Sequence, residues 1–213
     1  MAVSLWKNVA VAMQSAIATA KTITAISKAS PGVASCTSNG YSNGDYVLLT
    51  AQGMYQVNNK IVRVTGAATD SFSLEGIDTT NFDTFTSGSA QKITFGTSIL
   101  TATSMSASGG SYDFIDTTTI HANQKSQVPG LPNPVSYSFD NLWDPTDAGQ
   151  VAMKSASDST ATRAFKFTFG TGGAIVVFTG YVGFNGAPTG SAQDKVVTPA
   201  VITQYGTLTS YSS

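Results

Sequence analysis

The chain has 213 residues, enough for one large β domain or for one domain that carries an insertion. Charged residues make up 11% of the chain, against about 25% in an average soluble domain, and Ser, Thr, Gly and Ala fill the difference. The formal net charge is -1, so the chain lacks the excess of Lys and Arg on which tight binding to a polyanion rests. The composition favours β structure and argues against a nucleic-acid-binding protein.

The cysteine content and the hydropathy of the chain indicate in which cell compartment the protein is made. Cys36 is the only cysteine, which excludes an intrachain disulfide and a secreted scaffold held together by disulfides. The apolar stretch 9–20 is too short to cross a bilayer, and Lys7 is its only basic flank. We therefore expect no targeting sequence, no membrane anchor and synthesis in a cytoplasm.

The first third of the chain is predicted to be β structure. Segment 8–26 mixes Ala and Met, which favour helix, with Val and Ile, which favour strands. The residues that follow, 22–97, form short apolar runs separated by turn residues, and this context decides for strands. The best strands are expected at 46–49, 60–64 and 71–74, so the stretch is predicted to be an all-β module.

The middle of the chain is rich in glycine and proline. Segment 104–110 is small and polar and ends in two glycines, which predicts a flexible joint. Pro129, Pro132 and Pro134 each remove a backbone donor, so residues 127–133 cannot form a central strand. We expect them to run over the surface before a strand resumes at 135–139.

One helix is predicted after this strand, and its start is marked by Asp144-Pro145-Thr146-Asp147. Asp144 is expected to cap the helix, Pro145 to occupy its first position, and Asp147 to interact favourably with the helix dipole. The helix is expected to end near Ser157 and to pack a narrow apolar stripe on a sheet.

The segment 163–184 predicts a long β-hairpin with a glycine-rich turn at 170–173. Its first arm alternates apolar and polar residues with a period of two, which indicates a half-buried strand. Its second arm contains an unbroken apolar run, which suits a strand covered on both faces, and what covers the second face is left open. The residues expected to support the sheet or the assembly are Phe165, Phe167, Phe169, Val177, Phe178, Tyr181 and Val182.

A search for catalytic or metal-binding residues gives mostly exclusions. His121 is the only histidine, so no site with several histidine ligands is available. Asp140, Asp144 and Asp147 lack the glycine and the bidentate glutamate of an EF-hand loop, and caps and turns account for them. We expect no enzyme, no cofactor and no metal site.

The order of features in the second half resembles the tail tube, or major tail, proteins of long-tailed, non-contractile bacteriophages (siphophages). The resemblance covers about residues 115–211 and takes segment 9–20 as a first barrel strand. The features that carry it are Ile115-Asp116-Thr117-Thr118, Val128-Pro129-Gly130-Leu131, the strand Val135-Ser136-Tyr137-Ser138-Phe139, Asp144-Pro145 with its helix, Phe178-Thr179-Gly180-Tyr181-Val182, and a final strand at 201–208 that contains Gly206.

This resemblance implies a mainly β, tail-tube-type β-sandwich or barrel subunit with one short helix packed on the sheet. Residues 1–21 and 98–213 are expected to form it, and residues 22–97 to be an inserted small β module. The resemblance also implies hexameric rings stacked into a hollow tube in the virion, which conducts double-stranded DNA from capsid to host during genome ejection. The expected partners are further copies of the chain, a tape-measure protein and a tail terminator.

Physical reasoning supports assembly independently of the resemblance. The second half offers too few long strands to close a barrel, and neighbouring copies would cover the sheet edges that it leaves open. A chain with little charge also suits a conduit, because a basic lumen would retard DNA. Polar members of the alternating strands, Gln14 and Thr168, are the candidates for the lumen.

Two other classes of function compete with this hypothesis. A carbohydrate-binding or adhesin-like β-sandwich would also be rich in Ser, Thr and Tyr and poor in charge. An enzyme ranks third, because it needs a cluster of titratable residues that the sequence does not suggest.

Overall fold

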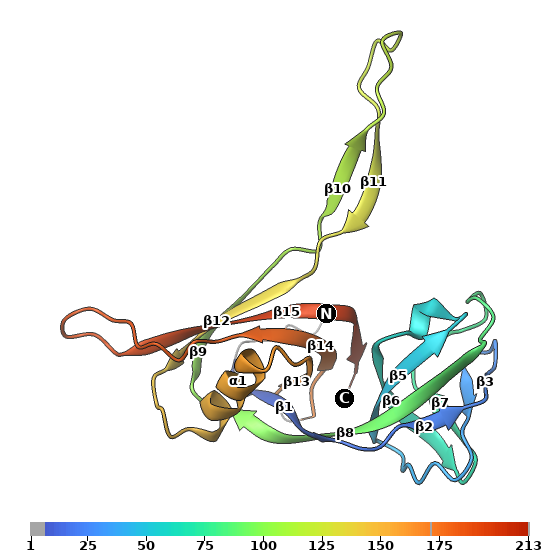
Figure 1. Cartoon of the computed structure of the whole chain (residues 1–213), viewed down its shortest axis with the longest axis horizontal. Helices are drawn as coiled ribbons and strands as arrows, with labels where there is room; N and C mark the ends of the chain where they lie inside the picture. Colours follow the sequence, from blue (N-terminus) through green and yellow to red (C-terminus); the bar gives the residue numbers. More distant parts are fainter. Residues whose placement is uncertain (1–6, 171, 213) are drawn as a thin grey trace.

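The computed structural model describes residues 7–170 and 172–212, which form antiparallel strands and one short α-helix (Figure 1). Thirteen of the described strands belong to one sheet with the order β3-β4-β7-β6-β5-β8-β1-β13-β14-β15-β12-β9, and β2 pairs with β8 outside this path. A separate two-stranded sheet contains β10 and β11. The mainly β fold with one short helix that the sequence predicts is confirmed.

The strands of the N-terminal part are mostly short. They are β1 (Val9–Ile17), β2 (Lys21–Ile23), β3 (Ala25–Ile26), β4 (Val33–Ser35), β5 (Tyr46–Gln52), β6 (Lys60–Ala68), β7 (Ser71–Leu74) and β8 (Ser87–Ile99), with the 3-10 helix η1 (Tyr55–Val57) after β5. The rest of the chain contains β9 (Ala102–Ser108), β10 (Tyr112–Asp116), β11 (Gln127–Pro132), β12 (Ser136–Leu142), α1 (Ala148–Asp158), β13 (Arg163–Phe169), β14 (Ile175–Gly183) and β15 (Val197–Tyr211).

Strand β8 joins the two parts of the chain. Its first half pairs with β5 and β2, and its second half pairs with β1, from Ile93 opposite Ile17 to Ile99 opposite Val11. The predicted end of the inserted module at residue 97 therefore lies inside a continuous strand. One hydrophobic core, which includes Phe72 and Leu74, draws all of its residues from the segment 22–97.

The hairpin of β13 and β14 is covered on both faces. On one face, Phe165, Phe167 and Phe178 pack in a core with Met153 of α1. On the other face, Ala164 and Val177 pack against Ile61 of β6, Ile93 of β8 and Tyr211 of β15. The segment 22–97 thus supplies the second cover that the apolar run of β14 requires, because a strand of this kind must be shielded from water on both sides.

The end of β15 packs against β6 on this second face. The hydroxyl Oη of Tyr211 accepts a hydrogen bond of 2.7 Å from the backbone N–H of Arg63, and the Arg63 guanidinium lies 4.7 Å from the centre of the Tyr211 ring. Gly206 has φ +81, and a Cβ there would lie 2.6 Å from the carbonyl oxygen of Asn59. Only glycine satisfies both the backbone angle and the close approach.

Segment 104–110 is not the predicted flexible joint, since most of it is strand β9, paired with β12. Met105 lies opposite Phe139, and Ala107 lies opposite Tyr137, so the alternate residues of β9 face the core side of β12. The hydropathy pattern did not predict this strand, because its small side chains give almost no hydropathy signal. The two glycines follow the strand with positive φ, where the chain leaves the sheet.

The proline-rich segment 127–133 forms the strand β11, which pairs only with β10. Both strands are therefore edges. A two-stranded ladder accommodates Pro129 and Pro132 because the missing N–H groups can face outward. The prediction that this segment is no central strand is confirmed.

The start of α1 differs from the prediction. The N-cap is Asp147, whose carboxylate accepts a hydrogen bond of 3.0 Å from the backbone N–H of Gln150. Asp144 instead accepts hydrogen bonds from the Thr146 hydroxyl and, at 2.9 Å, from the backbone N–H of Thr146. The hydroxyl bond first, and then the backbone bond, lower the pKa of the Asp144 carboxyl group. Pro145 thus lies in the turn before the helix.

A tertiary contact fixes this later start. The side-chain amide of Gln150 donates to the carbonyl oxygen of Leu142 at 2.6 Å and to Thr101 at 3.2 Å. A Cβ at Gly149 would lie 2.8 Å from the carbonyl oxygen of Ser98, so the first turn packs directly on the backbone of β8. The helix begins where it can meet the sheet, which a local capping pattern cannot indicate.

The assignment of the cap can be tested by two alanine substitutions. We expect Asp147→Ala to lower the free energy of unfolding by about 1 kcal/mol, because the N–H of Gln150 loses its acceptor. Asp144→Ala should cost less, since its carboxylate serves only the exposed turn. Urea denaturation measures both effects, and a larger loss for Asp144→Ala would contradict the assignment.

Burial of Tyr211 predicts a pH dependence of stability. Desolvation raises the pKa of Tyr211 from 10.0 to about 12. The folded state therefore favours the neutral phenol, and this contribution to stability is complete below pH 10 and is lost as the pH rises towards 12. Tyr41 shows a similar shift to about 12, so Tyr211→Phe should reduce this loss without abolishing it. Denaturation midpoints measured through this pH range test the prediction, and an unchanged slope in the variant would contradict it.

Candidate assembly surfaces

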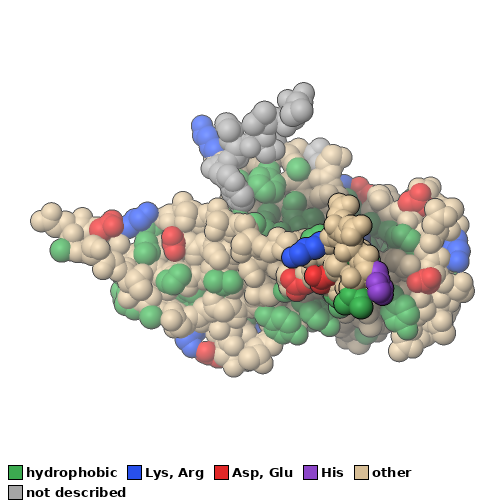
Figure 2. Space-filling view, turned by 90° about the horizontal axis from the view of Figure 1, so that it is seen from above, with side chains coloured by type: hydrophobic (Ala, Val, Ile, Leu, Met, Phe, Trp, Pro, Cys, Tyr) green, Lys and Arg blue, Asp and Glu red, His purple; other side chains and the backbone are tan. Residues whose placement is uncertain are grey.

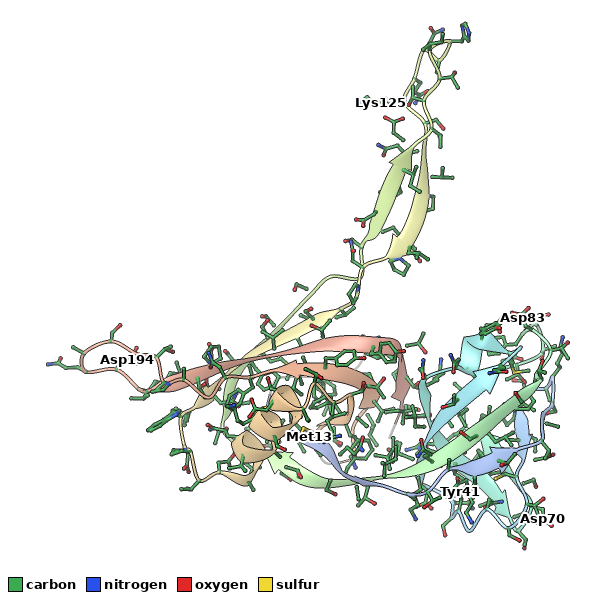
Figure 3. The ribbon with its side chains drawn as sticks, viewed as in Figure 1. Met13, Tyr41, Asp70, Asp83, Lys125 and Asp194 are labelled. Atoms are coloured by element: carbon green, nitrogen blue, oxygen red, sulfur yellow. The ribbon has the colours of Figure 1, made fainter. Side chains whose placement is uncertain are left out.

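The arm, residues 111–133, projects away from the rest of the molecule (Figures 1 and 3). It contains β10, β11 and the loop between them, and every residue in it except Gly130 is exposed. Figure 2 looks down on the molecule, with the arm pointing towards the viewer, and its purple side chain is His121, the only histidine. His121 is exposed near the tip.

The arm carries apolar side chains on both faces. Tyr112 and Phe114 lie on one face, whereas Ile115, with Val128 as its partner on β11, lies on the other. The exposed fractions are 60% for Phe114, 60% for Ile115 and 96% for Ile120. Two strands without a covering layer are marginally stable in water, and exposed apolar surface of this kind marks sites of interaction. The arm therefore has the character of a contact element.

Polar contacts order the tip of the arm. The backbone N–H of Thr118 donates to the carboxylate of Asp116 at 2.8 Å, and Thr118 Oγ1 accepts from the N–H of Ser126 at 3.0 Å. The hydrogen bonds from Thr118 lower the pKa of the Asp116 carboxyl group. The hydrogen bond between Ser126 and Thr118 links the two sides of the exposed loop.

A second surface lies on the outer side of β9, β12, β15 and the end of β14, and we call it the hydroxyl face. The buried side of these strands carries Met105, Phe139 and Ile202. Successive residues along each strand point in turn to the buried side and to the outer side, and the outer side is largely polar. Its members are Ser104, Ser106, Ser108, Ser136, Ser138, Asp140, Val201, Thr203 and Tyr181, which lie side by side in the pairing registers.

The hydroxyl face carries almost no charge. Asp140 is the one ionisable carboxylate among its members, and it accepts a hydrogen bond of 3.2 Å from Ser104. Ser136 and Thr203 face each other across β12 and β15 at 3.5 Å. These side chains can hydrogen-bond to water, but they offer no cation to a phosphate group.

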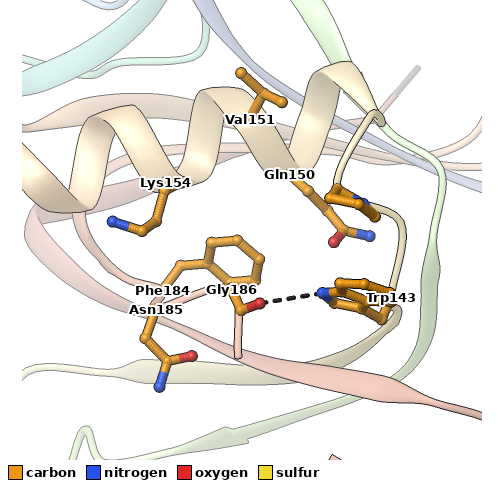
Figure 4. Close-up of a pocket in the computed structure, with 8 residues that line it drawn as sticks. Trp143, Gln150, Val151, Lys154, Phe184, Asn185 and Gly186 are labelled. Atoms are coloured by element: carbon orange, nitrogen blue, oxygen red, sulfur yellow. Dashed lines mark hydrogen bonds between the residues drawn. The ribbon is translucent and has the colours of Figure 1, made fainter. Parts of the chain in front are cut away.

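A groove lies between α1 and the residues that follow β14 (Figure 4). Trp143 lines it and donates a hydrogen bond of 3.1 Å from Nε1 to the carbonyl oxygen of Gly186. Val151 and Phe184 line it as well, and Lys154 is the one ionisable group among its described lining residues. The apolar lining and the exposed indole ring of this groove suit an apolar or aromatic-stacking group.

The structure separates the predicted assembly residues into two groups. Phe165, Phe167, Val177, Phe178 and Val182 are buried inside the subunit, and Phe169 is partly buried against the same core. Tyr181 is 44% exposed and lies on the hydroxyl face. The side chains of the buried group pack within the cores of one subunit.

The predicted lumen residues lie away from the hydroxyl face. Gln14 is half-buried in β1, where its side-chain oxygen accepts a hydrogen bond of 3.1 Å from the backbone N–H of Ala164. Thr168 lies on the side of β13 that also carries Ala164 and Lys166, and the Lys166 ammonium lies 5.4 Å from the centre of the Tyr46 ring. That side of the hairpin faces the segment 22–97.

Sequence reasoning missed both surfaces, although each left a signal. The alternation Ser136-Tyr137-Ser138-Phe139-Asp140 marks a strand with one polar and one apolar face. For the arm, the signal was an apolar residue pair, Phe114-Ile115, beside prolines that forbid a central strand.

Within residues 7–170 and 172–212, no three His, Cys, Asp or Glu side chains are grouped so that they could hold a metal ion. The described part of the chain contains no helix long and apolar enough to span a membrane.

Comparison with protein families gives a match to this chain. A family model described as phage tail tube protein matches residues 52–213, which is well over half of the chain and includes the arm, the hydroxyl face and α1. No curated protein matches the chain. The family match confirms the resemblance on which the sequence analysis relied.

Proposed function

Since this chain belongs to the family of phage tail tube proteins, we propose that its copies form hexameric rings that stack into the hollow tail tube. Double-stranded DNA then passes through the tube from capsid to host during genome ejection. Family membership establishes a structural role in the virion tail, and the proposal adds the ring, its stacking and the transport of DNA. Synthesis in the host cytoplasm belongs to the same proposal.

The hydroxyl face carries this proposal, because it has the properties that a DNA conduit needs in its lumen. The hydroxyl groups of its five serines and of Thr203 keep a shell of water, and its one carboxylate per copy repels phosphate. Phosphate contacts with Lys or Arg would hold the DNA and slow its passage. We assign the lumen to this face in place of Gln14 and Thr168.

The arm supports contacts between copies. Its apolar side chains are solvated in a single subunit, and burial against another copy would remove this surface from water at a gain of roughly 25 cal/mol per Å². Contact with a tape-measure protein or a tail terminator is a further part of the proposal. These partners would meet the surfaces that rings present at the ends of a tube.

Residues 22–97 are proposed to be an inserted module with its own core. Its removal would have to preserve Ile93 and the second half of β8, because Ile93 packs against the β13–β14 hairpin and β8 pairs with β1.

One observation favours the alternative of a glycan-binding module. Trp143 is 40% exposed and lines the same groove as Asn185, and a groove that offers an aromatic ring and an amide can stack on a sugar and hydrogen-bond to it. A glycan-binding module would bind sugars as a small particle and would not polymerise.

Electron microscopy of the purified, concentrated protein separates the two functions. We expect hollow tubes with a regular axial repeat, in which the symmetry of a cross-section gives the number of copies in a ring. Small isolated particles, also after addition of candidate initiator proteins, would contradict the tube.

The role of the arm can be tested with the double substitution Phe114→Ser and Ile115→Ser. Both side chains are exposed, so we expect the stability of the unassembled subunit to change by no more than about 0.5 kcal/mol, whereas tube formation is lost. Tyr55→Ser is the matched control, since Tyr55 is 67% exposed on η1, outside the arm. Normal tubes from the double variant would contradict the proposed role.

The lumen assignment predicts the effect of an added cation. Ser138→Arg places one positive charge per copy on the hydroxyl face, and we expect assembled tubes of this variant to retain DNA at low salt and to release it at high salt. Ser155→Arg on the exposed side of α1 is the control with the same net charge. Equal DNA retention by the two variants would argue against a lumen on this face.

A further inference from the structure

The hydroxyl face is bordered by a strand edge that has no partner within the described residues. β9 is the last strand of the sheet and pairs only with β12. Its sequence is Ala-Thr-Ser-Met-Ser-Ala-Ser, without the charges or prolines that normally protect an exposed edge from pairing with another chain. The one irregularity in its pairing with β12 lies at the start of the strand, between Ala102 and Ser104. The opposite end of the sheet is β3, which has only two residues. The unprotected edge is therefore β9.

A second edge borders the same face on its other side. The pairing of β14 with β13 ends at Gly180, whereas its pairing with β15 continues to Gly183. The stretch 181–183 thus has a strand on one side only. Beside this stretch runs an open groove lined by Ser157 of α1 and by Gly183, Phe184 and Asn185.

The directions of the strands make these two edges complementary. Each neighbouring pair in the series β9, β12, β15 and β14 is antiparallel, so β9 and β14 run in opposite directions. When β9 of a second copy lies beside β14, the pair is again antiparallel. The same contact can then repeat from copy to copy and close a ring, because it joins two different surfaces of identical chains.

The side chains fit the same arrangement. Apart from Met105, the residues of β9 are Ala, Ser and Thr, and the receiving edge contains Gly183. A Cβ at Gly183 would meet no atom closer than 3.7 Å, so space remains next to this edge. A narrow strand can therefore approach it closely without displacing other side chains.

We propose that β9 of one copy pairs antiparallel with the 181–183 edge of β14 in a second copy of this chain. The proposal rests on the tail tube function and names the strands that join neighbouring copies in a ring. The pairing continues the hydroxyl face from copy to copy, and it satisfies the outward backbone groups of β9 that one subunit leaves to water.

Amide hydrogen exchange of the unmodified protein tests the pairing. We expect peptides that cover β9 and residues 181–183 to exchange at least about tenfold more slowly in tubes than in unassembled subunits, because new ladder hydrogen bonds protect them. Peptides of β12 serve as the internal control, since β12 already has a strand on each side. Equal exchange of β9 in both forms overturns the pairing.

Disulfide formation tests the same contact by geometry. Gly183→Cys is combined in turn with Ser104→Cys, Ser106→Cys or Ser108→Cys, whose positions lie on the hydroxyl face. Oxidised tubes of one of these variants should give a ladder of linked copies on a non-reducing gel, because facing residues bring their Cβ atoms within bonding range. Gly183→Cys with Met105→Cys is the control, since Met105 points to the opposite side of β9.

The outcomes separate the pairing from the function. Tubes that show neither protection of β9 nor any disulfide ladder overturn the pairing and leave the tail tube proposal intact. Protein that stays as small particles under all assembly conditions overturns both. If the cysteine variants do not fold, the exchange measurement on the unmodified protein decides alone.

Discussion

The rest of the structure depends on the burial of both faces of the β13–β14 hairpin. Phe165 and Phe178 fill one core with α1, while Val177 fills another with residues of β6 and β8. A shift of this hairpin by one residue would exchange the two sets of side chains, and large rings would meet a space shaped for Ala and Val. The register of the central strands is therefore fixed within one subunit.

The subunit completes its cores without a partner and leaves its contact surfaces for assembly. The arm exposes apolar side chains on both faces, and β9 exposes a backbone edge. Neither the apolar side chains of the arm nor the open backbone edge of β9 belongs to the buried cores. A subunit built in this way can fold first and polymerise later, because assembly requires no rearrangement of the packed hairpin.

Much of the fold could be predicted from the sequence, because the elements concerned are specified locally. The period of two at Phe165 and Phe167, the glycine turn after them and the apolar run of β14 identified the hairpin. The sequence predicted the helix but misplaced its cap, since Gln150 is held by Leu142 and Thr101 from other elements. It missed β9, whose serines and alanines carry no hydropathy signal.

The sequence by itself determined which residues alternate along each strand and that the chain has little charge to offer a polyanion. Only the tertiary structure decided which alternating strands are covered. Phe178 and Phe114 both lie in β-hairpins, yet Phe178 is fully buried and Phe114 is 60% exposed. The difference arises because burial depends on strands that are distant in sequence: β14 lies between β13 and β15, whereas β10 has only β11 as a neighbour. A local pattern specifies two faces, but the long-range pairing selects the one that meets solvent.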